Sequence, residues 1–327
     1  MTGYLVRRVL YGLLAIFAVS VLSFVIIQLP PGDYVTSYIA ALEAQGGEVN
    51  AEEAAALRAY FGLGEPMHIQ YLKWMGQIFR GNFGMSFQYR IPVLDVIGER
   101  MFLTVLLALG TLVFVWLTAI PIGIISAVRQ YSFLDYFATT VGFTGLAVPD
   151  FLLALVLMYF AWDIYGFSIG GLFSPEYVEA PWSTGRVIDL LKHMIIPIIV
   201  LGTSGTASLI RITRANLLDE LRKPYVVTAR AKGMSEWKLV LKYPVRLALN
   251  PIISLTAYIL PFLVSGSVIV SVVLNLPTLG PVLLRSLLSQ DMFLAGSIIL
   301  MIGTMTVIGT LLSDILLAAV DPRVRLQ

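Results

Sequence analysis

The sequence predicts an all-α membrane protein with six transmembrane helices, and two observations lead to this fold class. Hydrophobic residues make up 58% of the 327 residues and charged residues only 13%, and the mean hydropathy is +0.85. So little polar surface cannot solvate a globule of this size. The second observation is a series of long apolar runs, because a helix that crosses a bilayer needs about 20 consecutive apolar residues.

Six such runs follow one another along the chain. The run Tyr136–Trp162, the third in chain order, contains one charged residue, Asp150. The other five runs contain no Asp, Glu, Lys or Arg. The charge-free runs are Val9–Pro30, Met101–Val128, His193–Ile210, Leu247–Leu284 and Met292–Ser313. The run His193–Ile210 is short and contains Pro197, but neighbouring helices satisfy the carbonyl that a transmembrane proline frees. We therefore expect six spans.

Basic residues set the expected orientation, since cytoplasmic loops are enriched in Lys and Arg. Arg7 and Arg8 precede the first run, and Arg323 and Arg325 follow the last. Both termini are therefore expected in the cytoplasm, as an even number of spans requires. The segment Arg211–Arg246, with nine basic and three acidic residues, then also lies inside. A cleaved signal peptide is the alternative for the first run, but its apolar core is longer than that of a signal peptide.

The runs divide the chain into three expected parts. Residues 1–31 hold the N-terminus and the first helix, residues 32–100 form an extracytoplasmic insert between helices one and two, and residues 101–327 form a core with helices two to six. The insert contains "NAEEAAALRAYF", in which Asn50 and Glu53 predict the N-terminus of a short helix.

Composition argues against chemistry within this chain. It has no Cys, and His68 and His193 are too far apart to form a local metal motif. The P-loop pattern G-x-x-x-x-G-K-[ST] does not occur. We expect no catalytic residue, metal or cofactor. The remote alternative, an intramembrane hydrolase, needs a nucleophile and a base or several metal ligands inside the membrane. A further alternative is an ion-coupled secondary transporter, which would show inverted repeats and several buried ionisable groups.

One basic segment, "KPYVVTARAKGMSEWKLVLKYPVR", lies between two apolar runs. Pro224 suits a first helical position and Gly233 suits a helix C-cap, so the pattern predicts a helix of about nine residues. Ser235 then caps a second short helix. Two helices hinged at a glycine form an element that docks into a groove on another protein. The alternative is that the charges only fix topology or contact anionic lipid.

This segment resembles a known motif. Residues 228–251, "TARAKGMSEWKLVLKYPVRLALNP", are similar to the cytoplasmic motif of the permease subunits of bacterial ATP-binding-cassette (ABC) importers, in the dipeptide, oligopeptide and nickel branch. The glycine of that motif falls on Gly233 and its alanine on Ala229. The segments "YLVRRVL", "LPPGD", "FGLGEPMHIQYLKWMGQIFRGNFGMSF", "NLPTLG" and "LLSDILLAAVDPRVR" also resemble the first of the two paired permeases of the branch. The chain departs from the pattern at Ser271, where Glu is usual, and at Asp150, where Ser is usual.

The resemblance implies a protein that is not itself an enzyme. It would form half of the path for oligopeptides, with oligosaccharides or another small solute, such as a nickel chelate, as the alternatives. The implied partners are a second permease subunit in a heterodimer, two cytoplasmic ATP-binding subunits that hold ATP and Mg, an extracytoplasmic substrate-binding protein, and the lipid bilayer of a bacterial or archaeal inner membrane; no nucleic acid is implied. The residues expected to couple to the ATPase are Tyr225, Thr228, Ala229, Ala231, Lys232, Gly233 and Ser235.

Four residues are candidates for the substrate pathway: Asp150, Ser204, Ser267 and Ser271. In one continuous helix, Asp150 lies about 14 residues from Tyr136, or roughly 21 Å at 1.5 Å per residue, well inside a bilayer. Pro149 would free the carbonyl of Gly145 and open the helix to polar partners. The alternatives are a structural cap for Asp150, and close helix packing by small residues around Ser204, Ser267 and Ser271.

Overall fold

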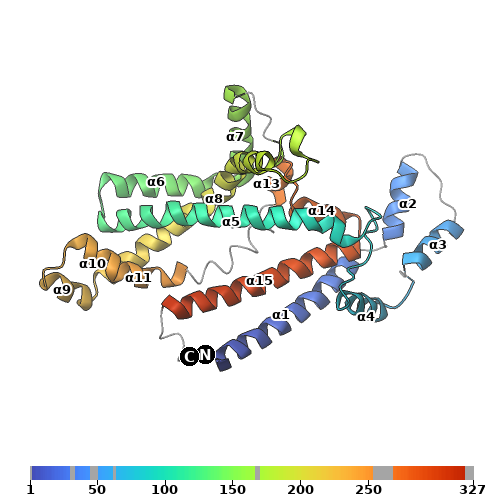
Figure 1. The fold of residues 1–327 in the computed structure, drawn as a ribbon, viewed down its shortest axis with the longest axis horizontal. Coiled ribbons are helices and arrows are strands. Elements are labelled where there is room, and N and C mark those ends of the chain that lie inside the picture. The colour runs from blue at the N-terminus through green and yellow to red at the C-terminus, as the bar shows by residue number, and fades with distance from the viewer. Residues whose placement is uncertain are drawn as a thin grey trace. The chain divides into compact units, whose positions relative to one another are not determined.

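The computed structural model describes residues 2–29, 34–44, 51–61, 64–165, 170–252 and 268–320, and Figure 1 shows that these residues are mainly helical. No strand occurs in the described ranges, which contain one isolated bridge between Met85 and Pro92. The helices are α1 Thr2–Gln28, α2 Tyr34–Ala44, α3 Ala51–Phe61, α4 Met67–Ile78, α5 Val93–Val128, α6 Phe133–Ala147, α7 Asp150–Tyr165, the 3-10 helix η1 Pro175–Tyr177, α8 Thr184–Leu221, α9 Pro224–Ala231, α10 Glu236–Lys242, α11 Pro244–Ala248, α13 Val268–Val273, α14 Leu279–Leu288 and α15 Met292–Val320.

Four helices are long and apolar enough to cross a membrane. They contain the segments Val6–Gln28, Val93–Val128, Thr184–Leu221 and Met292–Ile315. These segments confirm four of the expected spans and make the chain a polytopic membrane protein. Two of them, in α5 and α8, are 36 and 38 residues long, so these helices extend well beyond the apolar runs from which they were predicted.

The span predicted at Tyr136–Trp162 is not one continuous helix, so the depth of Asp150 that was estimated from a continuous helix is wrong. Helices α6 and α7 form a pair bent by 101°, and they count as a fifth span only if taken together. Val148, the residue before Pro149, has extended backbone angles of φ −83° and ψ 121°, because proline disfavours the helical conformation at the preceding residue. The helix then restarts at Asp150, where the amides of Leu152 and Leu153 donate to the carbonyl of Pro149 at 2.9 and 3.1 Å.

The remaining predicted span, Leu247–Leu284, includes residues 253–267, which lie outside the described residues. Helix α11 lies at its beginning, and α13 and the start of α14 lie toward its end. Six spans, the loop positions that follow from them, and the expected boundaries at residues 31 and 100 stay predictions.

The chain divides into two compact units, which are described separately. One consists of residues 5–104 and 278–307. Its core contains Phe24, Trp74, Phe87 and Ala295, and a Cβ placed on Gly296 would lie 2.9 Å from the Trp74 ring. The helix expected from "NAEEAAALRAYF" is confirmed as α3.

A buried carboxylate, that of Asp291, connects the loop before α5 to the first turn of α15 in this unit. Asp291 is 0% exposed and precedes α15. Its Oδ2 accepts hydrogen bonds from Ser86 Oγ at 2.6 Å and from the Gln88 amide at 3.0 Å, while its Oδ1 accepts from the Leu294 amide at 3.1 Å. The loop before α5 is therefore attached to the N-terminus of α15 through one side chain.

The other unit consists of residues 1–4, 105–277 and 308–327. Helix α8 is its central element, because α6, α7, α11 and α13 all pack against it. A second buried cluster, with Val115, Ala119, Leu209, Ile210 and Ile252, joins α5 to α8. This arrangement places the turn between α5 and α6, the C-terminal end of α8 and the helices α9 to α11 at one end of the unit (Figure 1).

Candidate functional site

The basic segment forms two short helices, as its sequence predicts. Pro224 occupies the first turn of α9, and Lys223 before it is extended, with φ −71° and ψ 147°. After Lys232 the chain turns at Gly233, which has a φ of +77°. Ser235 is the N-cap residue of α10, although its side chain makes no capping hydrogen bond. The observed α9 is eight residues long, one fewer than expected.

The turn at Gly233 is a Schellman motif, the standard left-handed ending of a helix. The Gly233 amide donates to the Arg230 carbonyl at 3.0 Å and the Met234 amide donates to the Ala229 carbonyl at 3.4 Å. A Cβ on Gly233 would meet no atom within 4 Å, so there is room for a side chain. The requirement for glycine therefore comes from the backbone conformation.

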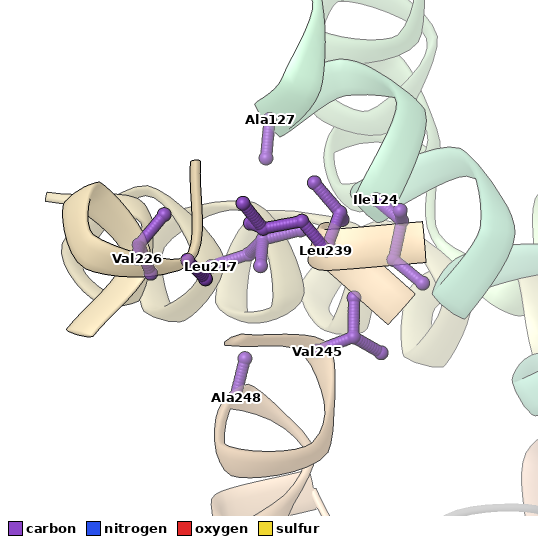
Figure 2. Packing of buried hydrophobic residues seen from close by; sticks show 9 residues of the cluster. Ile124, Ala127, Leu217, Val226, Leu239, Val245 and Ala248 are labelled. Carbon is purple, nitrogen blue, oxygen red and sulfur yellow. The ribbon is translucent and has the colours of Figure 1, made fainter. Parts of the chain in front are cut away.

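Apolar side chains fix both helices to the end of the bundle. Val226 of α9 and Leu239 of α10 are both 0% exposed, as is Leu217 of α8. Figure 2 shows these side chains gathered with Ile124 and Ala127 of α5. Fully burying a Leu or Val side chain contributes about 1.5–3 kcal/mol, so this cluster, which we call the coupling core, holds α9 and α10 against α5 and α8. Its other members are Ala229, Val240, Val245 and Ala248.

The seven predicted coupling residues do not share one face. Ala229 is buried in the coupling core. Tyr225 is half-buried, and its hydroxyl donates to Glu220 Oε2 at 2.6 Å; burial, and then the hydrogen bond to Glu220, raise the pKa of Tyr225. The exposed members are Thr228, Ala231, Lys232, Gly233 and Ser235. Two of the seven therefore face their own bundle, and five face outward.

Three apolar residues on the outer surface were missed by the sequence reasoning. Val227, Trp237 and Leu241 are 57%, 50% and 56% exposed. The spacing of Trp237 and Leu241, four residues apart on a helix, places them on one face, while Leu239 and Val240 face inward. This pattern was available in "EWKLVLK" and would have identified an outward apolar face.

An ion pair closes the turn between the two helices. Arg230 Nη2 donates to Glu236 Oε2 at 3.0 Å, and Arg230 Nε donates to the other carboxylate oxygen. The hydrogen bonds to Arg230 lower the pKa of Glu236, and Glu236 raises the pKa of Arg230. Both side chains are exposed, so the pair orients the turn and adds little to stability.

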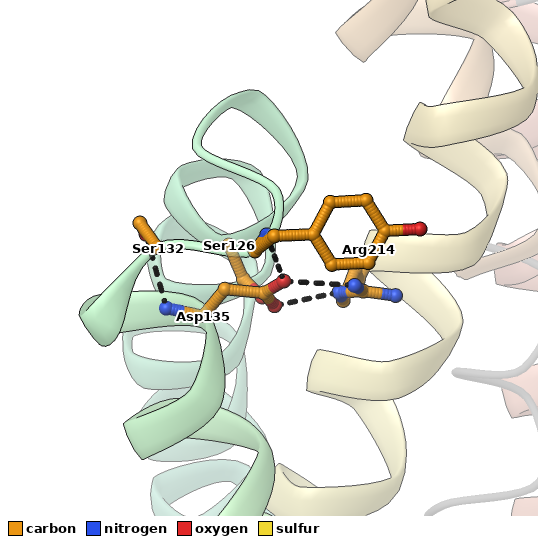
Figure 3. A network of polar contacts seen from close by, with 5 residues as sticks. Ser126, Ser132, Asp135 and Arg214 are labelled. Atoms are coloured by element: carbon orange, nitrogen blue, oxygen red, sulfur yellow. Dashed lines mark hydrogen bonds and ion pairs between the residues drawn. The ribbon is translucent and has the colours of Figure 1, made fainter.

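A polar network lies next to the coupling core, where α5, α6 and α8 meet (Figure 3). Asp135 of α6 is 2% exposed, and its two carboxylate oxygens accept from Arg214 Nε at 2.7 Å and Arg214 Nη2 at 2.8 Å. Asp135 also accepts from the Ser126 hydroxyl and, at 2.9 Å, from the Tyr131 amide. The signal that was missed is "SFLD", a capping pattern in which the Ser132 hydroxyl accepts from the Asp135 amide at 3.3 Å.

Two of the predicted pathway residues lie together. Asp150, in the first turn of α7, lies near the Ser204 hydroxyl of α8, and both side chains are half-buried. Ser271 of α13 is 0% exposed, and its hydroxyl has no hydrogen-bond partner in the described part of the chain. Ser267 lies outside the described residues. The structure therefore brings Asp150 and Ser204 together and buries Ser271.

The fold is that of a polytopic membrane protein, and comparison with known proteins gives its class. Residues 119–326 match the family described as "Binding-protein-dependent transport system inner membrane component". Residues 1–108 match the N-terminal model of such membrane components. The chain belongs to this family of permeases, as its motifs predicted.

Among its relatives are permeases with similar sequences along their whole length. The chain is 35% identical to the oligopeptide transport system permease protein AppB of Bacillus subtilis, over 99% of both chains. It is 34% identical to a putative peptide permease protein of Brucella suis, also over 99% of both. The glutathione transport system permease protein GsiC of Escherichia coli K12 is 31% identical, again over 99% of both chains.

Proposed function

We propose that this chain is one of two permease subunits of an ABC importer for short peptides. Full-length similarity to permeases named for oligopeptides and glutathione supports a peptide-type solute. The departures at Asp150 and Ser271 keep oligosaccharides, or another small solute, as the second candidate. In this proposal the chain has six spans with both termini in the cytoplasm, works with a second permease and an extracytoplasmic binding protein, and binds no ATP or Mg itself.

The observation that carries the proposal is the two-helix element at the end of α8. Helices α9 and α10 are fixed inward by the coupling core and present Val227, Trp237 and Leu241 outward. Exposed aromatic and aliphatic side chains on a rigid element favour docking into a groove of another protein. In our proposal the groove belongs to a cytoplasmic ATPase. Closure of two ATPase subunits then moves the coupling core, and with it α5 and α8, as a rigid body.

The proposed path for the solute passes the break between α6 and α7. The polar residues Thr203, Ser204 and Thr206 are half-buried midway along α8, and the hydroxyls of Thr118 and Thr206 lie 3.3 Å apart. A half-exposed polar stripe between apolar helices is typical of a surface that faces a water-filled path. Asp150 adds a carboxylate to the same stripe, because it lies near Ser204.

The first test is transport by the assembled complex. The two permeases, the ATPase subunits and the binding protein are reconstituted in liposomes. The uptake of a labelled tripeptide is then compared with the uptake of a labelled trisaccharide. We expect ATP-dependent uptake of the peptide alone. Uptake of the trisaccharide and not of the peptide would replace the peptide assignment by the second candidate.

The coupling element is tested separately with Gly233→Val. The left-handed conformation costs a residue with a Cβ about 1–2 kcal/mol, and more when the side chain is β-branched. We expect peptide uptake and substrate-stimulated ATP hydrolysis to fall while the complex still assembles. Gly233→Asn is the matched control, because Asn tolerates this conformation. Normal uptake with Gly233→Val would contradict the coupling role.

A further inference from the structure

A pocket of about 340 Å³ lies between α6 and α8, beside the polar network. On α6 its lining residues include Tyr136, Thr139, Phe143 and Leu146, and on α8 they include Ala207, Ile210, Arg211 and Arg214. On α6 these positions are three or four residues apart, and on α8 Ala207 and Arg211, and Ile210 and Arg214, are each four apart, so each helix contributes one continuous stripe. The pocket is therefore a groove that follows both helices.

The two helices are antiparallel and approach closely along this groove. A Cβ on Gly145 would lie 3.1 Å from Thr203 Cγ2 and 3.7 Å from Ala207 Cβ. At the opposite end of α6, Asp135 is paired with Arg214. The end that contains Leu146 is therefore apolar, and the end that contains Asp135 is charged. Eleven residues of helix separate these two positions, which corresponds to roughly 16 Å.

The charged end contains two arginines, Arg211 and Arg214, and the described residues neutralise only Arg214. Arg214 is held by the buried carboxylate of Asp135 through two hydrogen bonds, so this pair has no net charge. Arg211, one helical turn earlier, is exposed and makes no hydrogen bond or ion pair with the described residues. Among the described residues, the groove thus presents the unpaired guanidinium group of Arg211 beside a neutral ion pair. Guanidinium groups bind phosphate through paired hydrogen bonds.

The exposed side chains along the rest of the groove suit the headgroup region and the acyl chain of a lipid. Tyr131 and Tyr136, at the charged end, are 70% and 61% exposed, and Phe143 and Leu146, at the apolar end, are 57% and 41% exposed. Tyrosine is enriched where membrane proteins meet the headgroup layer, and exposed Phe and Leu side chains are suited to acyl chains. Basic pockets between transmembrane helices bind anionic headgroups.

We propose that this groove is a binding site for an anionic phospholipid, such as phosphatidylglycerol. The phosphate lies against Arg211 at the charged end, and one acyl chain lies along Phe143 and Leu146. The Asp135–Arg214 pair forms the floor of the headgroup site and joins it to the coupling core, since Ser126 of the network and Ala127 of the coupling core are neighbours on α5. Bound lipid would therefore contact the end of the bundle that carries α9 and α10.

The test measures lipid binding to the assembled, delipidated complex by native mass spectrometry. We expect phosphatidylglycerol to bind more tightly than phosphatidylcholine. Arg211→Gln should weaken phosphatidylglycerol binding about fivefold, the effect of one charge near a membrane surface, and Arg211→Lys should retain most of the preference. Arg222→Gln changes an exposed arginine at the C-cap of α8, outside the pocket; it is the matched control and should leave the preference intact. Equal binding of both lipids, or an unchanged preference with Arg211→Gln, would overturn the proposal.

Two further arms separate the lipid from other occupants. Soluble glycerol phosphate should fail to displace the lipid, because it lacks the acyl chain; displacement at comparable concentration would assign the site to a soluble phosphate. The chain contains no Cys, so Arg211→Cys introduces a single thiol. We expect this thiol to react with a maleimide in the lipid-free complex and to be protected by phosphatidylglycerol. Protection without lipid would show that the second permease covers the groove, and would also overturn the proposal.

Discussion

Asp135 and Asp291 are both buried aspartates near the first turn of a long helix, but different partners satisfy them. Asp135 is paired with the guanidinium of Arg214, from a helix 79 residues away in sequence. Asp291 is bound by one hydroxyl and by main-chain amides, and no cation lies within ion-pair distance of it among the described residues. A cation offsets the cost of burying a carboxylate directly, whereas neutral donors leave part of that cost in place.

The pKa of Asp291 reflects this difference. Burial raises the pKa of its carboxyl, and the hydrogen bonds from Ser86 and the Gln88 and Leu294 amides lower it by a smaller amount. Asp135 lies on α6 and connects it to Ser126 of α5 and Arg214 of α8. Asp291 connects a loop to one helix, α15. Asp135 therefore forms an ion pair between helices that are distant in sequence, whereas Asp291 caps a helix and attaches the preceding loop to it.

The largest expected effect is that of Arg214→Met. It leaves the Asp135 carboxylate buried without its cation, which costs about 3–5 kcal/mol in a fully buried site. Because the Arg214 side chain is 27% exposed, we expect the lower end, about 3 kcal/mol, in the free energy of unfolding in detergent. The double variant Asp135→Asn/Arg214→Met should be more stable than Arg214→Met alone. Additive losses in this double-mutant cycle would mean that the ion pair is not the source of the effect.

A smaller loss is expected for Asp291→Ala. The substitution leaves the Ser86 hydroxyl and two amides without their acceptor, and an unsatisfied buried donor costs about 1–3 kcal/mol. Ser86→Ala, which removes a single donor, should cost about 1 kcal/mol. Thermal unfolding of the two variants measures both. A Ser86→Ala variant that loses as much stability as Asp291→Ala would show that the hydroxyl, and not the set of donors, holds this loop.

The two aspartates should also differ from Asp150, which lies near the Ser204 hydroxyl. Asp150→Asn keeps the size of the side chain and its ability to accept a hydrogen bond, so we expect a change in stability of under about 0.5 kcal/mol. Uptake should fall several-fold, or the preference among peptides of different charge should change, if the carboxylate contacts the solute. Uptake is measured in reconstituted liposomes, with Ser204→Ala as the neighbouring comparison. Unchanged uptake of cationic, neutral and anionic peptides would make Asp150 a structural residue.

The smallest effect is the dependence of stability on pH. Because the folded-state pKa of Asp291 is raised, the folded protein binds a proton more readily than the unfolded chain at this position. The contribution of Asp291 to stability therefore falls as pH rises from the ordinary aspartate pKa through the raised value. We expect wild-type stability relative to Asp291→Ala to decline in this direction. A difference that grows with pH would contradict the raised pKa.

Sequence reasoning was most successful where structure is local. The apolar runs identified four spans, because a membrane helix must satisfy its own backbone hydrogen bonds within one segment. Pro224 and Gly233 located α9, because the first fixes a helical φ and the second permits a positive φ of +77°. The family motifs depended on the same local stretches and identified the class of transporter.

Tertiary structure decided what depends on two distant segments. Pro149 alone predicted only a kink, and the 101° bend between α6 and α7 arises where α7 packs on α8 and α13. No local pattern relates Asp135 to Arg214, or shows which helices cover Ala229. Hydrophobic period and turn chemistry act within a few residues, whereas the pairing of a buried charge and the choice of buried face depend on which helices meet. The sequence by itself therefore determined four of the spans, the short helices and the family, and only the packing of α5, α6, α7 and α8 decided which polar residues face one another.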